Sequence, residues 1–338
     1  MRVAVLGSGM MGTAMAWPLA DRGHAVTLVG THLDGEIVEA LRRGAAHPGL
    51  GVAVPDGVRA VPVGDVVQAL ADAEAVIVGV SSPGIHWAGR TLAGALGRRI
   101  PIAMITKGLE PAGDGLAVLP DLLREALPES MRVHPVAIGG PCIAGELARR
   151  REAAVVFAGR DAVDVRLFAE ALAAPYYRPT ASDDPVGVCV CAALKNAYAT
   201  AVGIGGGLLE REGVVRGPVA MHNLEAAIFA RAAIEIAAVV RAMGGNAGSA
   251  LGLAGAGDLF VTTSGGRSSR LGRLLGLGRS LEEARTELGN PTLEGVDIAR
   301  LFHERIPAGI AVDDVRLLRF LGEVLFARAD ARRIFEVT

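Results

Sequence analysis

Short apolar segments alternate with helix-like segments through the first half of the chain. Residues 11–22 and 65–71 place their apolar side chains at helical spacing, whereas the segments around them are continuously apolar. Strands that are apolar on both faces and alternate with helices are typical of a parallel, doubly wound sheet. We therefore predict an α/β domain, with strands at residues 2–6, 25–29, 75–80, 102–105 and 136–138.

The pattern changes near residue 182. Ser182-Asp183-Asp184-Pro185 combines capping residues with a proline at the first helical position, so a helix is expected to start there. The segments that follow carry apolar stripes at helical spacing, and no convincing strand pattern remains. The 338 residues are predicted to form a sheet domain at 1–181 and an all-helical domain at 182–338. The expected helices include residues 186–204, 221–243 and 313–327.

Charge and composition narrow the possible partners. With 34 Lys and Arg against 36 Asp and Glu, the formal net charge is -2, so the chain has no general field that would hold a nucleic acid. The basic stretch at residues 267–279 lacks interleaved aromatic residues and predicts a solvated helix with one phosphate ligand. We therefore expect no nucleic-acid partner, and any bound anion must be met by a local cluster.

The chain also gives no sign of export or membrane insertion. Glycines interrupt the apolar first twenty residues and only Arg2 supplies a charge ahead of them, so a signal peptide is not predicted. No uninterrupted apolar stretch reaches the ~20 residues of a membrane span. The three cysteines are odd in number, which argues against a disulfide framework and favours a reducing interior. We expect a cytoplasmic protein without a membrane span.

Residues 7–12 (GSGMMG) form a G-x-G-x-x-G motif between an expected strand and an expected helix. The first glycine permits the turn, the second lets the backbone approach a pyrophosphate, and the third allows close helix packing. The helix N-terminus then faces the phosphates. This context predicts a Rossmann-type dinucleotide-binding domain, although a glycine-rich turn without a ligand has the same pattern.

The end of the second strand leaves the choice of cofactor open. An acidic residue there would bind the ribose hydroxyls and favour NAD, but the sequence is Val29-Gly30-Thr31-His32, and Asp34 lies a little beyond. Thr31 and His32 could donate hydrogen bonds to a 2′-phosphate, which favours NADP weakly. A solvated turn explains the same residues nearly as well, so the predicted cofactor is NADP or NAD.

Lysine is rare in this sequence: Lys107 and Lys195 are the only two lysines, and arginine supplies the other Lys and Arg side chains. Arginine cannot replace a lysine that must exchange a proton, since its pKa is too high. Lys107 follows the strand at 102–105, at the edge of the sheet where ligands bind in such folds. Lys195 lies in an apolar helix, where a lysine either reaches solvent or has a task. Two surface lysines retained by chance are the alternative.

Two glycine-rich turns carry further candidate residues. Asp258 lies in Gly255-Ala256-Gly257-Asp258-Leu259, which would expose its carboxylate. Arg267 lies in Gly265-Gly266-Arg267-Ser268, a donor-rich turn suited to a phosphate.

With these motifs in this order, the chain resembles NAD(P)-dependent glycerol-3-phosphate dehydrogenase over nearly its whole length. The archaeal branch is the most similar, through residues 29–32 and 47–51. The landmarks of the resemblance are residues 7–14, 106–109, 140–146, 193–196, 252–259, 265–267 and 293–295.

The resemblance implies a Rossmann-type domain, a helical domain of the 6-phosphogluconate-dehydrogenase-like type, and a possible homodimer. It implies hydride transfer between sn-glycerol 3-phosphate and dihydroxyacetone phosphate, as in glycerophospholipid metabolism. Lys195 would be the acid–base group, Lys107 and Asn196 would orient and polarise the ketone, and Asp258 would position Lys195.

Independent physical reasoning agrees with these roles. Hydride transfer to a ketone builds negative charge on its oxygen, so cations beside that oxygen stabilise the transition state. Burial beside other cations would also favour a neutral lysine that acts as a base.

The binding residues implied by the resemblance form two sets. Thr262 and Arg267 would hold the substrate phosphate, and Glu294 would reach the nicotinamide carboxamide. The substrate set is Lys107, Gly140, Cys142, Asn196, Asp258, Thr262, Arg267 and Ser268. The cofactor set is Gly7, Ser8, Gly9, Met10, Met11, Gly12, Thr31, His32, Lys107, Ala144, Arg267 and Glu294, and no metal is expected.

Two departures from the family pattern leave alternatives open. Ser268 follows the phosphate arginine where the family has Asn, so a larger phosphorylated polyol or sugar is a second candidate substrate. Met10 and Met11 replace a small residue and an aromatic one, which affects only the cofactor side. A ketopantoate-reductase-like enzyme would place the partner Asn a full turn after Lys195, where Ala199 stands. A nucleotide sensor without catalysis would need none of the substrate motifs.

Overall fold

The computed structural model describes residues 1–214 and 222–338. They form two compact units. The first comprises Met1–Lys107 and Ala117–Pro185, and the second comprises Gly108–Leu116 and Val186–Thr338. The segment Gly108–Leu116 thus belongs to the second unit although it lies within the first half of the sequence. Met221, the expected first residue of the helix at 221–243, lies outside the described residues.

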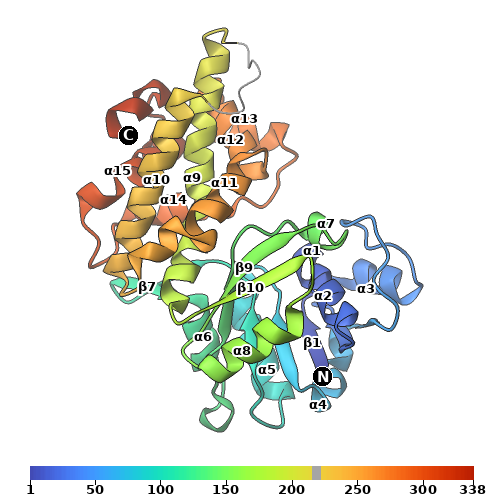
Figure 1. The fold of residues 1–338 in the computed structure, drawn as a ribbon. Helices are drawn as coiled ribbons and strands as arrows, with labels where there is room; N and C mark the ends of the chain where they lie inside the picture. The colour runs from blue at the N-terminus through green and yellow to red at the C-terminus, as the bar shows by residue number, and fades with distance from the viewer. Residues whose placement is uncertain (215–221) are drawn as a thin grey trace. The chain divides into compact units, whose positions relative to one another are not determined.

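The first unit is built on an eight-stranded sheet with the strand order β10-β9-β8-β5-β4-β1-β2-β3 (Figure 1). Neighbouring strands are parallel except that β8 and β9 are antiparallel, so the sheet is mixed at one side. The sequence pattern had not indicated β3, β9 or β10. β10 is an edge strand with a proline and half its residues exposed, which edge strands tolerate. The strands are β1 (Arg2–Leu6), β2 (Ala25–Val29), β3 (Arg59–Val61), β4 (Ala75–Val78), β5 (Ile102–Met104), β8 (Val136–Gly139), β9 (Ala153–Ala158) and β10 (Tyr177–Ser182).

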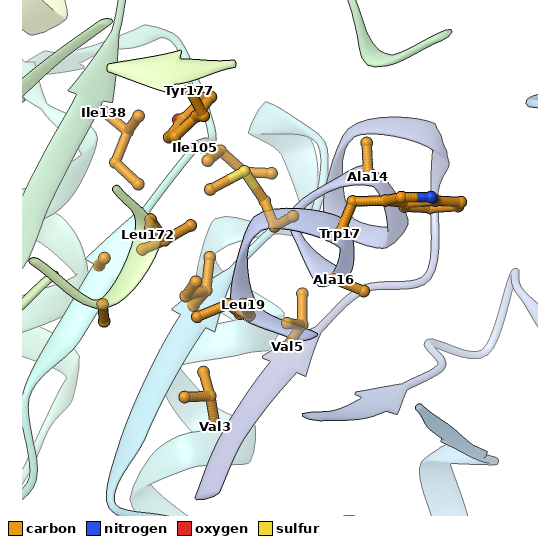
Figure 2. Close-up of a cluster of buried hydrophobic side chains, with 14 of the residues drawn as sticks. Val3, Val5, Ala14, Ala16, Trp17, Leu19, Ile105, Ile138, Leu172 and Tyr177 are labelled. Atoms are coloured by element: carbon orange, nitrogen blue, oxygen red, sulfur yellow. The ribbon is translucent and has the colours of Figure 1, made fainter. Parts of the chain in front are cut away.

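Both faces of this sheet are buried, as the continuous apolar strands predict. Along β1, Val3 and Val5 belong to one hydrophobic cluster, whereas Ala4 and Leu6 belong to the other. Figure 2 shows the first cluster, in which Leu19 lies over β1. The helices of this unit are α1 (Met10–Ala14), α2 (Ala16–Asp21), α3 (Gly35–Arg42), α4 (Val66–Ala71), α5 (Ile85–Ala95), α6 (Leu119–Ala126), α7 (Ala144–Leu147) and α8 (Ala162–Leu172), with 3-10 turns η1 (Val63–Asp65), η2 (Ser82–Gly84) and η3 (Glu129–Met131).

The single helix expected at residues 11–22 was wrong, because the segment forms two helices, α1 and α2, separated at Met15. Pro18 supplies the physical reason. Its nitrogen carries no proton and its ring conflicts with the carbonyl four residues earlier, at Ala14, where α1 ends.

The second unit is helical, and its described residues from Val186 onward contain no strand. A separate two-stranded sheet, β6 (Leu109–Ala112) with β7 (Gly115–Val118), lies earlier in the chain. The elements are α9 (Pro185–Arg211), α10 (Asn223–Ala242), η4 (Ala247–Leu251), the π-helix η5 (Leu253–Gly257), α11 (Asp258–Thr263), α12 (Arg267–Gly276), α13 (Leu281–Glu287), α14 (Glu294–Glu304), η6 (Val312–Val315), α15 (Arg316–Phe326) and η7 (Ala331–Val337).

Helix α9 is the central helix of this unit and starts at Pro185, as the capping pattern predicts. It is long and apolar enough to cross a membrane by length and composition. However, 89% of its most apolar window is buried inside the protein, as expected for the core helix of a globular unit.

Glycines let α9 and α12 pack backbone against backbone. A Cβ at Gly272 would lie 1.9 Å from the carbonyl oxygen of Thr200, and one at Gly276 would lie 2.3 Å from that of Ile204. The contact is reciprocal, since a Cβ at Gly203 or Gly207 would meet backbone atoms of α12 at 2.2 or 2.1 Å. Only glycine allows this approach, and it fixes the position of α12 relative to the middle of α9.

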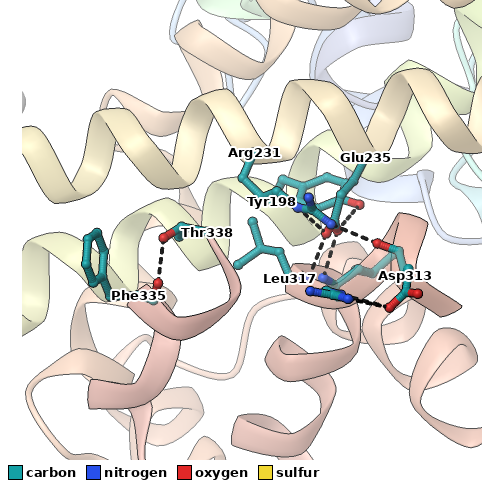
Figure 3. Close-up of polar contacts among 9 residues, drawn as sticks. Tyr198, Arg231, Glu235, Asp313, Leu317, Phe335 and Thr338 are labelled. Atoms are coloured by element: carbon teal, nitrogen blue, oxygen red, sulfur yellow. Dashed lines mark hydrogen bonds and ion pairs between the residues drawn. The ribbon is translucent and has the colours of Figure 1, made fainter.

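Glu235 joins three helices of the second unit (Figure 3). Its side chain is fully buried. One carboxylate oxygen accepts from Arg231 Nε and the Leu317 backbone N–H, both at 2.8 Å. The other accepts from the Tyr198 hydroxyl at 2.9 Å and the Leu318 N–H at 3.1 Å. Burial raises the pKa of Glu235 above its usual value despite these donors.

Glu235→Gln is expected to lower the free energy of unfolding by about 1–3 kcal/mol, because an amide nitrogen, unlike either oxygen of a carboxyl group, cannot accept a hydrogen bond, so a buried N–H loses its partner. The effect should depend on pH. Since the pKa of Glu235 is raised on folding, the stability it contributes is fully present below the unfolded value of 4.5 and is lost as pH rises through the folded value. Urea unfolding of both proteins from pH 4 to 8 should show their difference shrinking with pH.

The exposed residue Glu36 provides the matched control, because Glu36→Gln removes the same charge from the surface. A stability difference between wild type and Glu235→Gln that stays constant across this pH range would contradict the prediction.

Candidate functional site

The glycine-rich turn of the first unit has the close contacts that its motif predicts. Gly7 has φ +109°, and a Cβ there would lie 2.9 Å from the backbone of Gly79. A Cβ at Gly12 would lie 2.2 Å from the Gly7 carbonyl oxygen. Gly9, by contrast, has no atom within 4 Å of the position that a Cβ would occupy. The second glycine of the motif therefore faces open space, which fits the approach of a cofactor pyrophosphate.

Ser8 is held from several directions within this turn. Its N–H donates to Asp34 Oδ2 at 3.0 Å, and its carbonyl accepts from the Thr13 hydroxyl at 3.0 Å. His47 Nε2 lies 3.0 Å from the same carbonyl. Because His47 Nδ1 accepts the N–H groups of residues 49 and 50, Nε2 carries the proton and donates it to Ser8. The Ser8 hydroxyl oxygen is buried without a partner among the described residues, so the turn keeps one unused polar group.

The Asp34 carboxylate, just after β2, accepts hydrogen bonds from two backbone N–H groups. Its Oδ2 also accepts the Thr31 N–H at 2.8 Å, so one carboxylate oxygen joins the glycine-rich turn to the segment after β2. The Thr31 hydroxyl accepts the Leu33 N–H at 3.2 Å, which leaves its own proton to donate. The exposed His32 lies edge-on to Trp87 with ring centroids 5.8 Å apart.

Asp34→Ala is expected to raise the KM of both NADH and NADPH by roughly tenfold while kcat stays near the wild-type value. The substitution removes the common acceptor of two backbone N–H groups and loosens the cofactor turn, without touching a reacting atom. Steady-state kinetics with each cofactor measures this, and Asp56→Ala, at an exposed loop aspartate, is the control. A selective loss of NADH alone would show instead that Asp34 binds the ribose.

Lys107 lies just after β5 and is half-buried. The Thr106 hydroxyl donates to the Val80 carbonyl at 2.8 Å, and the Ser82 hydroxyl donates to the Lys107 carbonyl. These bonds hold the segment after β5 against the segment after β4. Lys107 is thereby fixed at the carboxyl edge of the parallel strands, where its position in the sequence predicts it.

The segment after β8 lies beside the glycine-rich turn. Gly140 has φ +122°, and a Cβ there would approach Val155 Cα to 3.1 Å, so glycine is required. Cys142, Ala144 and Met11 all pack against the same hydrophobic cluster of the first unit. Cys142, Met11 and Ala144 are each half-buried. The structure thus brings this part of the predicted set together with the turn.

In the second unit, Lys195 forms a buried ion pair with Asp258. The Lys195 ammonium donates to Asp258 Oδ1, and the side chains are 11% and 2% exposed. Lys195 comes from the middle of α9, and Asp258 is the first residue of α11, directly after the π-helix η5. π-helical turns occur frequently at functional sites. The structure thus pairs Lys195 with Asp258, the residue that the resemblance names as its positioning partner.

Asn196 is oriented by Glu294. Its amide nitrogen donates to Glu294 Oε2 at 3.0 Å. The two helices meet closely at this point, because a Cβ at Gly295 would lie 2.6 Å from the backbone of Asn196. Glu294, expected to reach the cofactor, therefore has one oxygen engaged by Asn196, and the Asn196 carbonyl oxygen is directed by this bond.

The three residues expected at the substrate phosphate differ in their surroundings. The Thr262 hydroxyl donates to the Asp258 carbonyl at 2.6 Å, so its proton is already engaged. Arg267 is exposed at the first position of α12, and no hydrogen bond or ion pair of its guanidinium occurs within the described residues. Ser268 is 8% exposed and lies next to it. Arg267 is the member of this set with donors available to an anion.

Several residues that hold the site were not indicated by the sequence. His47 and Thr13 were noted only as parts of family landmarks, and Ser82 gave no signal, because its bond joins segments distant in the chain. No group of three or more His, Cys, Asp or Glu side chains that could hold a metal ion occurs in residues 1–214 and 222–338.

Two family models match the chain in succession. Residues 2–164 match the N-terminus of NAD-dependent glycerol-3-phosphate dehydrogenase, and residues 184–336 match its C-terminus.

Individual relatives agree with these matches. An NADP(+)-dependent glycerol-3-phosphate dehydrogenase of Archaeoglobus fulgidus is 33% identical over 96% of this chain and 95% of its own length. A glycerol-3-phosphate dehydrogenase [NAD(P)+] of Myxococcus xanthus is 34% identical over 90% of this chain and 87% of its own. The crystal structure of glycerol-3-phosphate dehydrogenase from Coxiella burnetii has a TM-score of 0.82 and 26% identity, covering 99% of this chain and 97% of that one.

Proposed function

Because the chain belongs to the NAD-dependent glycerol-3-phosphate dehydrogenase family, we propose that it interconverts sn-glycerol 3-phosphate and dihydroxyacetone phosphate with NADP or NAD. The observation that carries this proposal is the buried pair of Lys195 and Asp258 in the second unit. A buried lysine held by a carboxylate is a proton donor at a defined position, which ketone reduction requires.

The cofactor belongs to the glycine-rich turn. Gly9 offers the approach for its pyrophosphate, and Gly7 and Gly12 give the turn its shape. The proposed contacts of the adenosine end are Ser8, Thr31 and His32, with Met10 and Met11 at the wall. The bound nicotinamide supplies or accepts the hydride. The free proton of the Thr31 hydroxyl supports acceptance of a 2′-phosphate, so we expect NADPH to serve at least as well as NADH.

The reacting oxygen is proposed to meet Lys195. As hydride reaches the carbonyl carbon, Lys195 gives its proton to the oxygen, and Asp258 holds the amine in place. Lys107 and Asn196 polarise the carbonyl, and Glu294 fixes the direction of the Asn196 amide. Gly140, Cys142 and Ala144 are proposed to line the nicotinamide side. In the reverse direction the lysine takes the proton of the alcohol.

Arg267 is proposed to bind the substrate phosphate. Its guanidinium matches a phosphate in geometry and charge, and within the described residues its donors are not used by protein groups. Thr262 and Ser268 lie on either side of it in the chain. Because Ser268 is largely covered by protein, its short side chain opens little additional space, which supports the small triose phosphate over a larger polyol phosphate.

Three further proposals concern the localisation, the pathway and the assembly of the enzyme. We propose a cytoplasmic enzyme of glycerophospholipid metabolism that acts on a small phosphorylated compound, with a homodimer as its assembly. Gel filtration with light scattering tests the assembly directly.

The purified protein is expected to oxidise NADPH, and NADH less effectively or equally, when dihydroxyacetone phosphate is added. Absorbance at the nicotinamide band, with paired KM values for the two cofactors, measures both expectations. Ketopantoate and a pentulose phosphate are the comparison substrates. Turnover of either of these in place of the triose phosphate would assign the chain to a different reaction, and cofactor binding without any turnover would indicate a sensor.

A further inference from the structure

The second unit contains a large cavity to which no role has yet been given. Its volume is about 1010 Å³. Its walls come from the end of α9 at Arg211, from residues 275–290 around α13, and from residues 324–331 between α15 and η7. Neither Lys195 nor Asp258 lines it, so it is distinct from the catalytic pair.

Arginines from separate elements converge on this cavity. Arg211, Arg279, Arg285 and Arg328 all line it. Within the described part of the chain, the guanidinium groups of Arg211, Arg285 and Arg328 make no hydrogen bond or ion pair, and Arg279 has only a long contact of 3.8 Å with Glu287. Guanidinium groups present planar sets of donors that match phosphate oxygens. The cavity therefore concentrates unused anion-binding donors.

The acidic residues of the lining are mostly engaged elsewhere. The Glu283 carboxylate accepts from the backbone N–H and hydroxyl of Ser280 at 2.8 and 2.9 Å. The Asp330 carboxylate is bound by the Arg332 side chain, which lowers the pKa of Asp330 to about 2. Glu282 is the third acidic residue of the lining. The lining carries four arginines against three acidic residues, and the charge of Arg332 offsets that of Asp330.

The rest of the lining is apolar or conformationally fixed. Leu275 and Leu325 are buried at the wall, with the half-buried Phe326 beside them. Asn290 and Arg328 adopt left-handed backbone conformations with φ 51° and 56°. Such conformations are costly for residues other than glycine and persist where the surrounding structure imposes them.

We propose that this cavity is a second anion site, which binds a small molecule carrying two or more linked phosphate groups. The arginines bind the phosphates, and the apolar wall contacts the remainder of the molecule. The volume suits a ligand of this size, because pockets for small molecules commonly span about 300–1,000 Å³. The proposal does not depend on which substrate the catalytic residues use.

Inorganic triphosphate is the probe, measured by isothermal titration calorimetry on the whole protein saturated with glycerol 3-phosphate and without NADPH, because NADPH itself carries linked phosphates. We expect wild type to bind one equivalent, and Arg211→Ala/Arg285→Ala to bind at least about tenfold more weakly. Arg166→Ala/Arg241→Ala removes the same charge from exposed helix positions outside the cavity and should bind like wild type.

Arg328→Ala provides an independent variant, also expected to weaken binding. Thermal melts of every variant show that it is folded, and triphosphate should raise the melting temperature of wild type and of the control only. The proposal is overturned if wild type binds no triphosphate under these conditions. It is equally overturned if the cavity variants and the control variant bind with the same affinity.

Discussion

Lys195→Met should abolish turnover of dihydroxyacetone phosphate while the protein still binds its cofactor. Lys195 is buried, and its amine donates to Asp258 at a fixed position. Methionine has a similar length and no proton to give, so the reaction loses its acid–base group. General acid–base catalysis typically contributes ~10²–10⁴-fold to the rate. We expect kcat, measured by steady-state kinetics, to decrease by a factor within this range or larger. The cofactor affinity, measured by fluorescence titration, should be unchanged.

Two further variants separate proton transfer from a structural role. Lys195→Arg keeps the charge and the pairing with Asp258, but arginine holds its proton and should rescue little activity. Asp258→Asn keeps the size of the side chain and removes the charge beside Lys195, so the pH profile of kcat should shift as well as its height. A Lys195→Met enzyme with near-wild-type kcat, or a fully active Lys195→Arg enzyme, would remove Lys195 from the proposed mechanism.

The sequence predicted those features that depend on neighbours along the chain. The strands of the sheet interior are continuous apolar runs, and β1 indeed buries alternate residues on both faces. The glycine motif predicted close backbone contacts, which Gly7 and Gly12 make. The start of α9 was predicted correctly at Pro185, because capping residues and proline act locally.

Features that depend on tertiary contacts could not be predicted in the same way. The antiparallel pairing of β8 with β9 is not encoded in either strand alone. Asp34 lies a little beyond the place expected for a ribose-binding carboxylate, yet it accepts the N–H of Ser8 in the glycine-rich turn and that of Thr31 after β2. The resemblance names Asp258 as the partner of Lys195, but the burial and geometry of this pair, whose residues lie 63 positions apart, are visible only in the fold.

The close contact between the glycines of α9 and α12 also depends on the tertiary fold, and replacing one of these glycines is expected to destabilise the protein strongly. Gly272→Ala should lower the free energy of unfolding by about 3 kcal/mol, the upper part of the usual range for overpacking. The reason is geometric, since the new Cβ would lie 1.9 Å from the Thr200 carbonyl oxygen and the helices must separate. Urea unfolding measures the loss. Gly94→Ala, at an exposed helical glycine with open space, is the control and should gain up to ~1 kcal/mol.

The same substitution should also impair catalysis in molecules that remain folded. α12 starts with Arg267 and α9 carries Lys195, so separating the two helices moves the proposed phosphate ligand relative to the proton donor. A displacement of about 1 Å can reduce the rate by roughly a hundredfold. We therefore expect kcat/KM for dihydroxyacetone phosphate to fall by up to this factor, with a smaller change in the KM of NADPH because the glycine-rich cofactor turn lies in the first unit. If Gly272→Ala were destabilised yet kept its full kcat/KM, the glycine contact would stabilise the fold without positioning Arg267.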